Sequence, residues 1–135
     1  MLCTRAFTPS YAAPEILGVL DSSLETSEYT CAVDIWSLGC VMFEVLAGSV
    51  LFQKECFVWH FCCGKAESML EPLREPLREA VSEEGGFGFV RGLLSPDPVR
   101  RPSAVKALGD PWLKVSEARK VKGEGACLQY YDTVL

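Results

Sequence analysis

The chain has 135 residues, enough for a single domain, and a chain of this length buries roughly two-thirds of its unfolded surface on folding. Its formal net charge is −5 and its pI is about 4.9. These values exclude the strongly basic surface through which proteins bind nucleic acids and anionic membranes. Seven irregularly spaced cysteines, with no signal-peptide pattern before them, indicate reduced thiols and a cytoplasmic or nuclear location. We therefore expect neither a nucleic-acid nor a membrane partner.

The first part of the chain predicts loops around one short helix. Residues 1–10 lack apolar periodicity and are expected to be loop. In TPSYAAPEIL, Pro14 suits the first turn of a helix, and Gly18 suits its end. The polar run DSSLETSEY at 21–29 predicts a second loop.

The run TCAVDIWSLGCVMFEVLAG at 30–48 is apolar on almost every side and predicts a buried central helix. Thr30 suits its N-cap and Gly48 its end. The uninterrupted apolar part is too short to cross a bilayer. A carboxylate that faces a protein core needs hydrogen-bond donors, so we expect Asp34 to anchor a backbone loop there.

The segment KECFVWHFCC at 54–63 predicts a short, partly exposed helix, with a strand as the alternative. On a helix, Cys56, His60 and Cys63 would share one face and could supply three zinc ligands. Cysteines among aromatic residues are more often packed thiols, so we expect no metal site. The apolar face of 54–63 is a candidate docking surface for another protein, with plain packing as the alternative.

The last third of the chain predicts short elements. The prolines of EPLREPLRE at 71–79 argue against a long helix and favour a loop with charged sides. The glycines of GGFGFVRG at 85–92 predict a structural loop, with helix beginning around Phe87. A further short helix is expected from Pro102. Residues 114–135 are predicted to be a charged, mobile tail.

Three separated segments, TPSYAAPE, DIWSLGCVMFEVLAG and LLSPDPVRRPSAVKALGDPWL, occur in one order. Together they resemble the carboxyl-terminal lobe of a eukaryotic Ser/Thr protein kinase, beginning at the A-P-E end of the activation segment. The resemblance implies an all-α fragment of a kinase domain at residues 1–113, followed by the tail. It also implies short helices around a central helix, without the sheet of the amino-terminal lobe.

The resemblance implies structural roles for four residues. Glu15 of A-P-E would form a buried ion pair with Arg101 of R-P-S-A. Asp34 would hold the backbone of the catalytic loop. Trp36 would pack beneath the A-P-E helix.

The resemblance also implies where a substrate would bind. Thr8, Pro9 and Tyr11 would belong to the floor that receives the residue after the phosphoacceptor. Thr4 lies four residues before Thr8 and is a candidate phosphosite. The TPSY form of this segment is similar to the Ser/Thr class of kinases.

Several parts that phosphoryl transfer requires are not found in the 135 residues. These are a glycine-rich G-x-G-x-x-G loop with its strand lysine, the H-R-D catalytic loop and the D-F-G aspartate. The family transfers the γ-phosphoryl group of ATP to protein Ser or Thr with the help of Mg2+. This chain is expected to bind neither ATP nor Mg2+, to contain no catalytic residue and to be inactive alone.

Three interpretations remain open from the sequence. The chain can be the end of a kinase whose beginning is missing here, a non-catalytic interaction module that docks through 54–63, or a relic without function. In the family, elements that precede the central helix cover one of its sides. We therefore expect a protein partner on the apolar surface left bare here.

Overall fold

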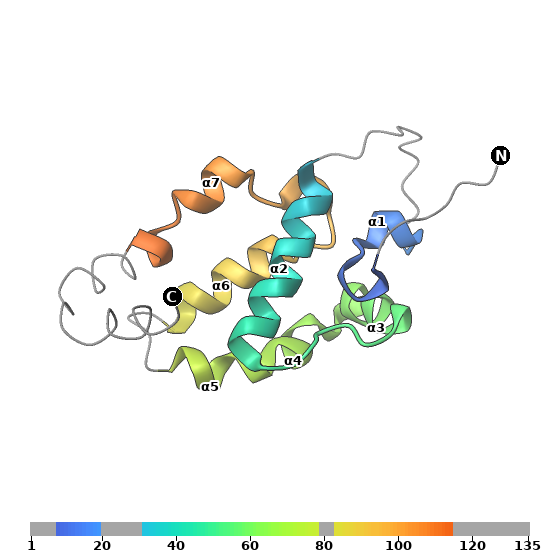
Figure 1. Cartoon of the computed structure of the whole chain (residues 1–135), viewed down its shortest axis with the longest axis horizontal. Coiled ribbons are helices and arrows are strands. Elements are labelled where there is room, and N and C mark those ends of the chain that lie inside the picture. Colours follow the sequence, from blue (N-terminus) through green and yellow to red (C-terminus); the bar gives the residue numbers. More distant parts are fainter. Residues whose placement is uncertain (1–7, 20–30, 79–82, 115–135) are drawn as a thin grey trace, which may run out of the picture.

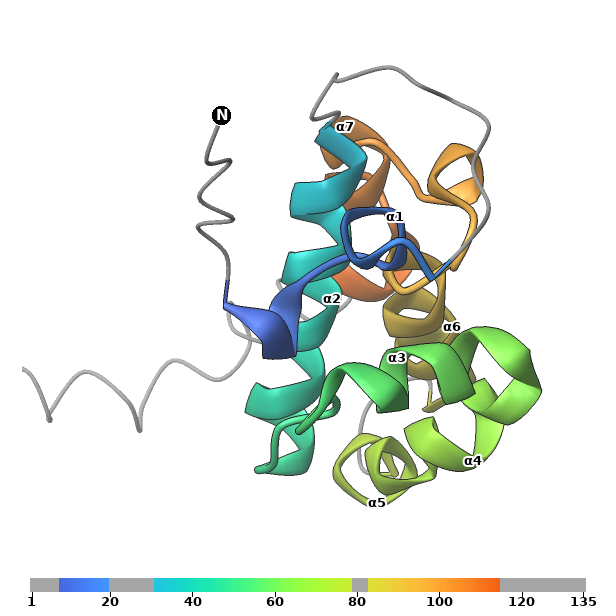
Figure 2. The same ribbon diagram turned by 90° about the vertical axis from the view of Figure 1, so that its right-hand side faces the viewer.

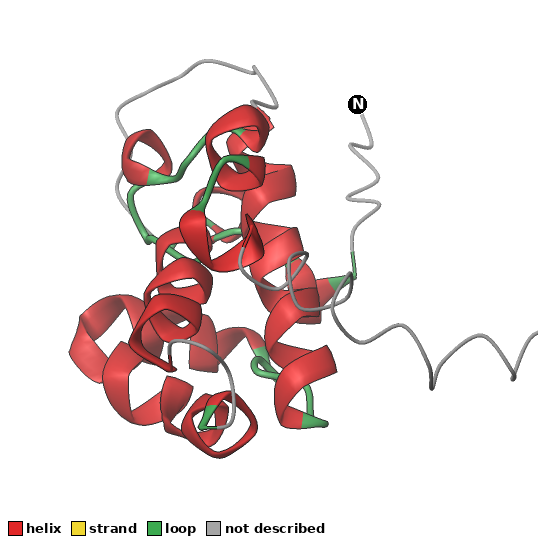
Figure 3. Ribbon diagram, turned by 90° about the vertical axis from the view of Figure 1, so that its left-hand side faces the viewer, coloured by secondary structure: helices red, strands yellow, loops and turns green. Residues whose placement is uncertain are grey.

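A computed structural model describes residues 8–19, 31–78 and 83–114. Every regular element in these ranges is helical, and they contain no strand (Figure 3). The all-α prediction is therefore confirmed. In chain order the elements are η1 (Pro9–Tyr11), α1 (Pro14–Leu17), α2 (Cys31–Ala47), α3 (Glu55–His60), η2 (Phe61–Lys65), α4 (Ala66–Leu70), η3 (Glu71–Leu73), α5 (Arg74–Leu77), α6 (Glu83–Leu93), η4 (Pro98–Arg100) and α7 (Ala104–Leu108).

Helix α2 runs through the centre of the molecule, with α6 packed along it (Figure 1). The shorter helices α3, α4 and α5 gather around one end of α2, whereas α7 lies near the other end (Figure 2). The core between them is aromatic and aliphatic, and its largest fully buried side chains include Trp36, Phe52, Phe61 and Leu94. None of the described helices is long and apolar enough to cross a bilayer.

Local sequence signals set several helix boundaries. Helix α1 starts at Pro14 and stops at Gly18, which has φ 68° and donates its N–H to the Pro14 carbonyl. Gly48, with φ 73°, follows α2 as predicted. Ser103 caps α7 by accepting the Lys106 N–H through its side chain. The expected N-cap of α2, Thr30, lies outside the described residues.

Two segments that were predicted to be loops are helical. The EPLR repeat forms the turns of η3 and α5, because Leu73 and Leu77 are four residues apart and both enter the core. Glycines 85–92 lie within α6, although each glycine costs a helix about 1 kcal/mol relative to alanine. Burial of Phe87, Val90 and Leu93 on one face of α6 outweighs that cost.

One glycine of α6 is required by packing, and a neighbouring one is not. A Cβ atom on Gly86 would lie 2.8 Å from Leu77 Cδ2 and 2.8 Å from Trp112 Nε1, whereas one on Gly88 would meet nothing within 4 Å. We expect Gly86→Ala to lower the free energy of unfolding by about 1–3 kcal/mol through overpacking. Gly88→Ala should raise it by about 0.5–1 kcal/mol through helix propensity. Urea denaturation of both variants tests this, and equal shifts would contradict it.

Candidate functional site

A buried ion pair joins α1 to the segment before α7. Arg101 Nη1 donates to Glu15 Oε1 at 2.6 Å and Nη2 donates to Oε2 at 2.8 Å, so the contact is bidentate. The Arg101 side chain is fully buried, and that of Glu15 is 15% exposed. The structure thus brings together the two residues that the sequence analysis paired, although they are 86 positions apart.

The remaining donors of Arg101 satisfy backbone carbonyls. Its Nε donates to Ser95 at 2.8 Å, its Nη1 also to Ala32 at 2.8 Å, and its Nη2 to Pro96 at 3.2 Å. A planar guanidinium can make this fork of contacts, whereas a lysine ammonium cannot. Arg101 therefore fixes α1, the first turn of α2 and the 95–96 loop at one point.

Trp36 lies beneath this ion pair. The Arg101 guanidinium carbon is 5.1 Å from the centroid of the Trp36 ring, a cation–π distance. The indole stacks on Phe52 at 5.5 Å and meets the edge of Phe61 at 5.8 Å. Trp36 Nε1 is buried and has no hydrogen-bond partner among the described residues. The ion pair and the aromatic cluster thus form one continuous anchor.

The segment from Thr8 to Tyr11 lies on the surface beside α2. Thr8 and Pro9 are exposed, and the Thr8 side chain makes no capping hydrogen bond. Tyr11 is half-buried, and its hydroxyl donates to Glu44 Oε2 at 2.6 Å. Ser37 Oγ donates to the Tyr11 carbonyl at 2.9 Å. The segment is therefore tied to two successive parts of α2 while its first residues stay accessible.

The sequence analysis assigned no role to Glu44 or Ser37. Both are polar residues in the otherwise apolar run of α2, and that position was the only available signal. Their partner Tyr11 is 33 and 26 positions away, so helical periodicity could not reveal the contacts.

The hydrogen bond from Tyr11 to Glu44 raises the pKa of the phenol above 10.0, and burial adds to the shift. A raised pKa in the folded state means that this stabilisation is complete below pH 10 and is lost as pH rises further. We expect ultraviolet titration to show one tyrosine ionising later than the others, and Tyr11→Phe should remove that component. A titration curve unchanged by Tyr11→Phe would contradict the assignment.

The expectation that Asp34 faces the core is wrong. Asp34 is exposed. Leu38, Val41 and Val45 are 42%, 45% and 76% exposed, and their spacing places them on the same face of α2 as Asp34. These four residues form the open stripe of α2. The central helix is therefore buried along one side only.

Residues 55–63 form α3 and the start of η2, with Lys54 at the N-cap, so the strand alternative is excluded. Val58 and Phe61 enter the core, whereas Phe57 and Trp59 are 37% and 52% exposed. The helical path changes at Gly64, which has φ 96°. Across the described ranges, no group of three His, Cys, Asp or Glu side chains could hold a metal ion.

Two thiols near Arg101 differ from the exposed cysteines. Burial raises the pKa of Cys40 to about 12, against a smaller opposing effect of the Arg101 charge. Burial likewise raises the pKa of Cys62 to about 11. The candidate phosphosite Thr4 and the tail beyond Lys114 lie outside the described residues.

The described fold is that of the helical part of a protein kinase domain. Residues 2–113 match the sequence model of the protein kinase domain, and the chain belongs to this family. The match begins before the A-P-E segment and ends at the residues that follow α7.

Named relatives agree with this membership. Hormonally up-regulated neu tumor-associated kinase of Mus musculus is 35% identical over 118 residues, which are 87% of this chain and 15% of the relative. The serine/threonine-protein kinases RAD53 of Saccharomyces cerevisiae and chk-2 of Caenorhabditis elegans are 31% and 34% identical, over 81% and 88% of this chain. This chain spans 14% of RAD53 and 23% of chk-2.

A solved structure confirms the fold. The crystal structure of the Rad53 kinase domain and SCD2 matches 78% of this chain with a TM-score of 0.53 and 29% identity. This chain covers 36% of that structure. The chain is thus a kinase-domain fragment whose relatives are Ser/Thr kinases.

Proposed function

We propose that residues 8–114 are the peptide-binding part of a Ser/Thr protein kinase domain, and that this chain alone does not transfer phosphate. The hydrogen bonds of Tyr11 with Glu44 and Ser37 carry the proposal, because they fix the segment from Thr8 to Tyr11 against α2. The bidentate contact between Arg101 and Glu15 fixes α1, which follows that segment. Thr8, Pro9 and Tyr11 would receive the substrate residue after the phosphoacceptor. Asp34 would hold a catalytic loop that other residues supply.

ATP and Mg2+ are the cofactors of the complete family domain, and the residues of this chain do not fit them. The 135 residues have none of the glycine-rich, H-R-D or D-F-G elements that position ATP and its metal. The described acidic residues do not converge on a metal site. We therefore assign no step of phosphoryl transfer to this chain.

A transfer assay tests this proposal directly. The purified 135-residue chain, given labelled ATP, Mg2+ and a mixture of Ser- and Thr-containing peptides, should incorporate no label above a mock purification. Incorporation that survives further purification and scales with the amount of chain would contradict the proposal. Equilibrium dialysis against ATP provides an independent check, with no retention expected.

The genomic sequence upstream of Met1 can distinguish two cases. In the first, the chain is the end of a complete kinase whose gene model is truncated. In the second, it is a separate interaction module. An open frame that encodes H-R-D and D-F-G would favour the complete kinase. A stop codon in every frame near Met1 would favour the interaction module.

We propose docking through 54–63 as the second candidate function, because Phe57 and Trp59 are exposed although both are large and apolar. A Trp59→Asp variant should lose partners that the parent chain retains in affinity capture. Val105→Asp is a matched control, since Val105 is 80% exposed on α7. Identical partner sets for all three proteins would argue against this face.

We also propose that a protein partner covers the open stripe of α2. Val41→Asp should then reduce binding of such a partner, and the Val105→Asp control should not. Binding unaffected by Val41→Asp would argue against the stripe as an interface.

The unpaired state of the five described cysteines supports a cytoplasmic or nuclear location.

A further inference from the structure

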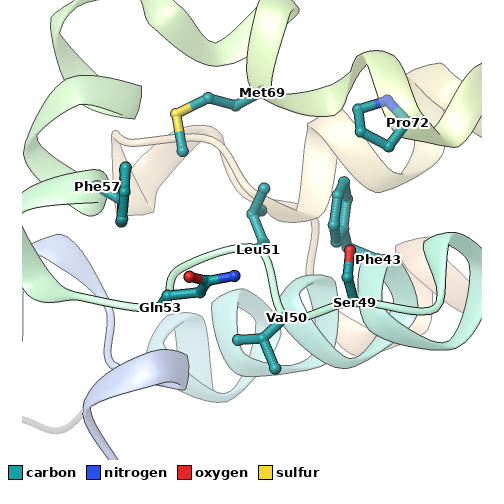
Figure 4. Close-up of a pocket in the computed structure, with 8 residues that line it drawn as sticks. All are labelled: Phe43, Ser49, Val50, Leu51, Gln53, Phe57, Met69 and Pro72. Carbon is teal, nitrogen blue, oxygen red and sulfur yellow. The ribbon is translucent and has the colours of Figure 1, made fainter.

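A shallow pocket of about 270 Å³ lies where the loop after α2 meets α3, α4 and η3 (Figure 4). Most of its walls are apolar, and two residues supply polar groups. The lining residues are Phe43, Ser49, Val50, Leu51, Gln53, Phe57, Met69 and Pro72. A pocket with apolar walls and a few polar groups suits an aromatic side chain with a polar tip, such as tyrosine.

The last described residues lie near α5, the helix that follows the pocket residue Pro72 along the chain. Trp112, two residues before the last described residue, and Leu77 of α5 both approach Gly86, each within 2.8 Å of a Cβ placed there. Leu77 is five helical residues beyond Pro72 in the pocket wall, a separation of about 8–10 Å. The residues after Lys114 therefore start a short distance from the pocket.

The 21 residues after Lys114 divide by composition. The stretch 115–125, VSEARKVKGEG, contains five charged residues, whereas 126–135, ACLQYYDTVL, contains only one. Eleven residues span about 36 Å when extended and about 18 Å as a flexible coil, so the first stretch can reach the pocket as a spacer. The second carries Tyr130 and Tyr131 next to Asp132, and exposed Lys54 follows Gln53 at the pocket.

We propose that residues 126–135 bind this pocket within the same chain, with a ring of the Tyr130–Tyr131 pair among Phe57, Met69 and Leu51. Two groups joined by a short linker meet at an effective concentration of the order of millimolar. A contact with a Kd of about 1 mM between separate molecules would therefore be formed in about half of the molecules within one chain. Because Phe57 belongs to both surfaces, the bound segment would compete with a partner docking on 54–63.

Hydrogen–deuterium exchange on the intact chain tests the proposal. Backbone amides of 126–135 should exchange about two- to tenfold more slowly than in the Met69→Glu variant. The matched control Val105→Glu should leave that protection unchanged. The tail variant Tyr130→Ser/Tyr131→Ser, which alters no residue of the described fold, should speed exchange at 49–53. Unchanged exchange across α6 checks that Met69→Glu remains folded.

Three outcomes would overturn the proposal. The first is exchange of 126–135 at the unprotected rate in the parent chain. The second is protection that Tyr130→Ser/Tyr131→Ser removes but folded Met69→Glu retains, which would place the segment elsewhere. The third is protection that disappears on hundredfold dilution, which would assign the contact to a second copy. None of these outcomes depends on whether the chain has kinase activity.

Discussion

Replacing Arg101 with leucine is expected to lower the free energy of unfolding by about 3–5 kcal/mol. The substitution leaves Glu15, whose side chain is 15% exposed, without its cation. It also removes the donors to the carbonyls of Ala32, Ser95 and Pro96. Since small domains are stable by about 5–15 kcal/mol, this loss would remove most of the stability of a domain at the lower end of that range.

Arg100 provides the control for this prediction. It precedes Arg101 directly, but its side chain is 81% exposed and pairs only with Asp97 at 3.5 Å. Arg100→Leu should change the free energy of unfolding by less than about 1 kcal/mol. Urea denaturation followed by circular dichroism compares the two variants, and coinciding midpoints would mean that the ion pair does not stabilise the fold.

Replacing Trp36 with alanine should destabilise the protein by about 3–5 kcal/mol, because it empties the space between Phe52, Phe61 and Arg101. Trp36→Phe should cost much less, about 1 kcal/mol. It keeps an aromatic ring and removes an N–H that has no partner, and an unpaired buried N–H itself costs about 1–3 kcal/mol.

The same denaturation assay separates these cases. Trp59→Ala is the matched control, since Trp59 is 52% exposed and should matter little to stability. If Trp36→Phe were as destabilising as Trp36→Ala, the indole N–H would have to make a stabilising contact, for example with a bound water.

Local sequence signals predicted the ends of α1 and α7. Proline, glycine and serine at the ends of α1 and α7 act through bonds to nearby residues, so those boundaries could be read locally. The contact between Glu15 and Arg101 could not, because no periodicity connects residues 86 positions apart. That expectation depended on the resemblance to the kinase family.

The errors have a common physical origin in tertiary packing. The glycine-rich part of α6 was read as loop because propensity was considered without Trp112 and Leu77, which approach Gly86. Asp34 was expected to be buried because α2 is apolar on nearly every side. Burial depends on which elements pack against a helix, and the described elements leave the open stripe of α2 uncovered.

The buried thiol of Cys40 has a practical consequence for measuring dynamics. With its pKa near 12, only about one thiol in ten thousand is ionised at pH 8, and its side chain is 2% exposed. Cys31, Cys56 and Cys63 are exposed and should react in the first, fast phase of alkylation. The rate at which Cys40 is subsequently labelled then records how often α2 separates from its neighbours, without any engineered probe.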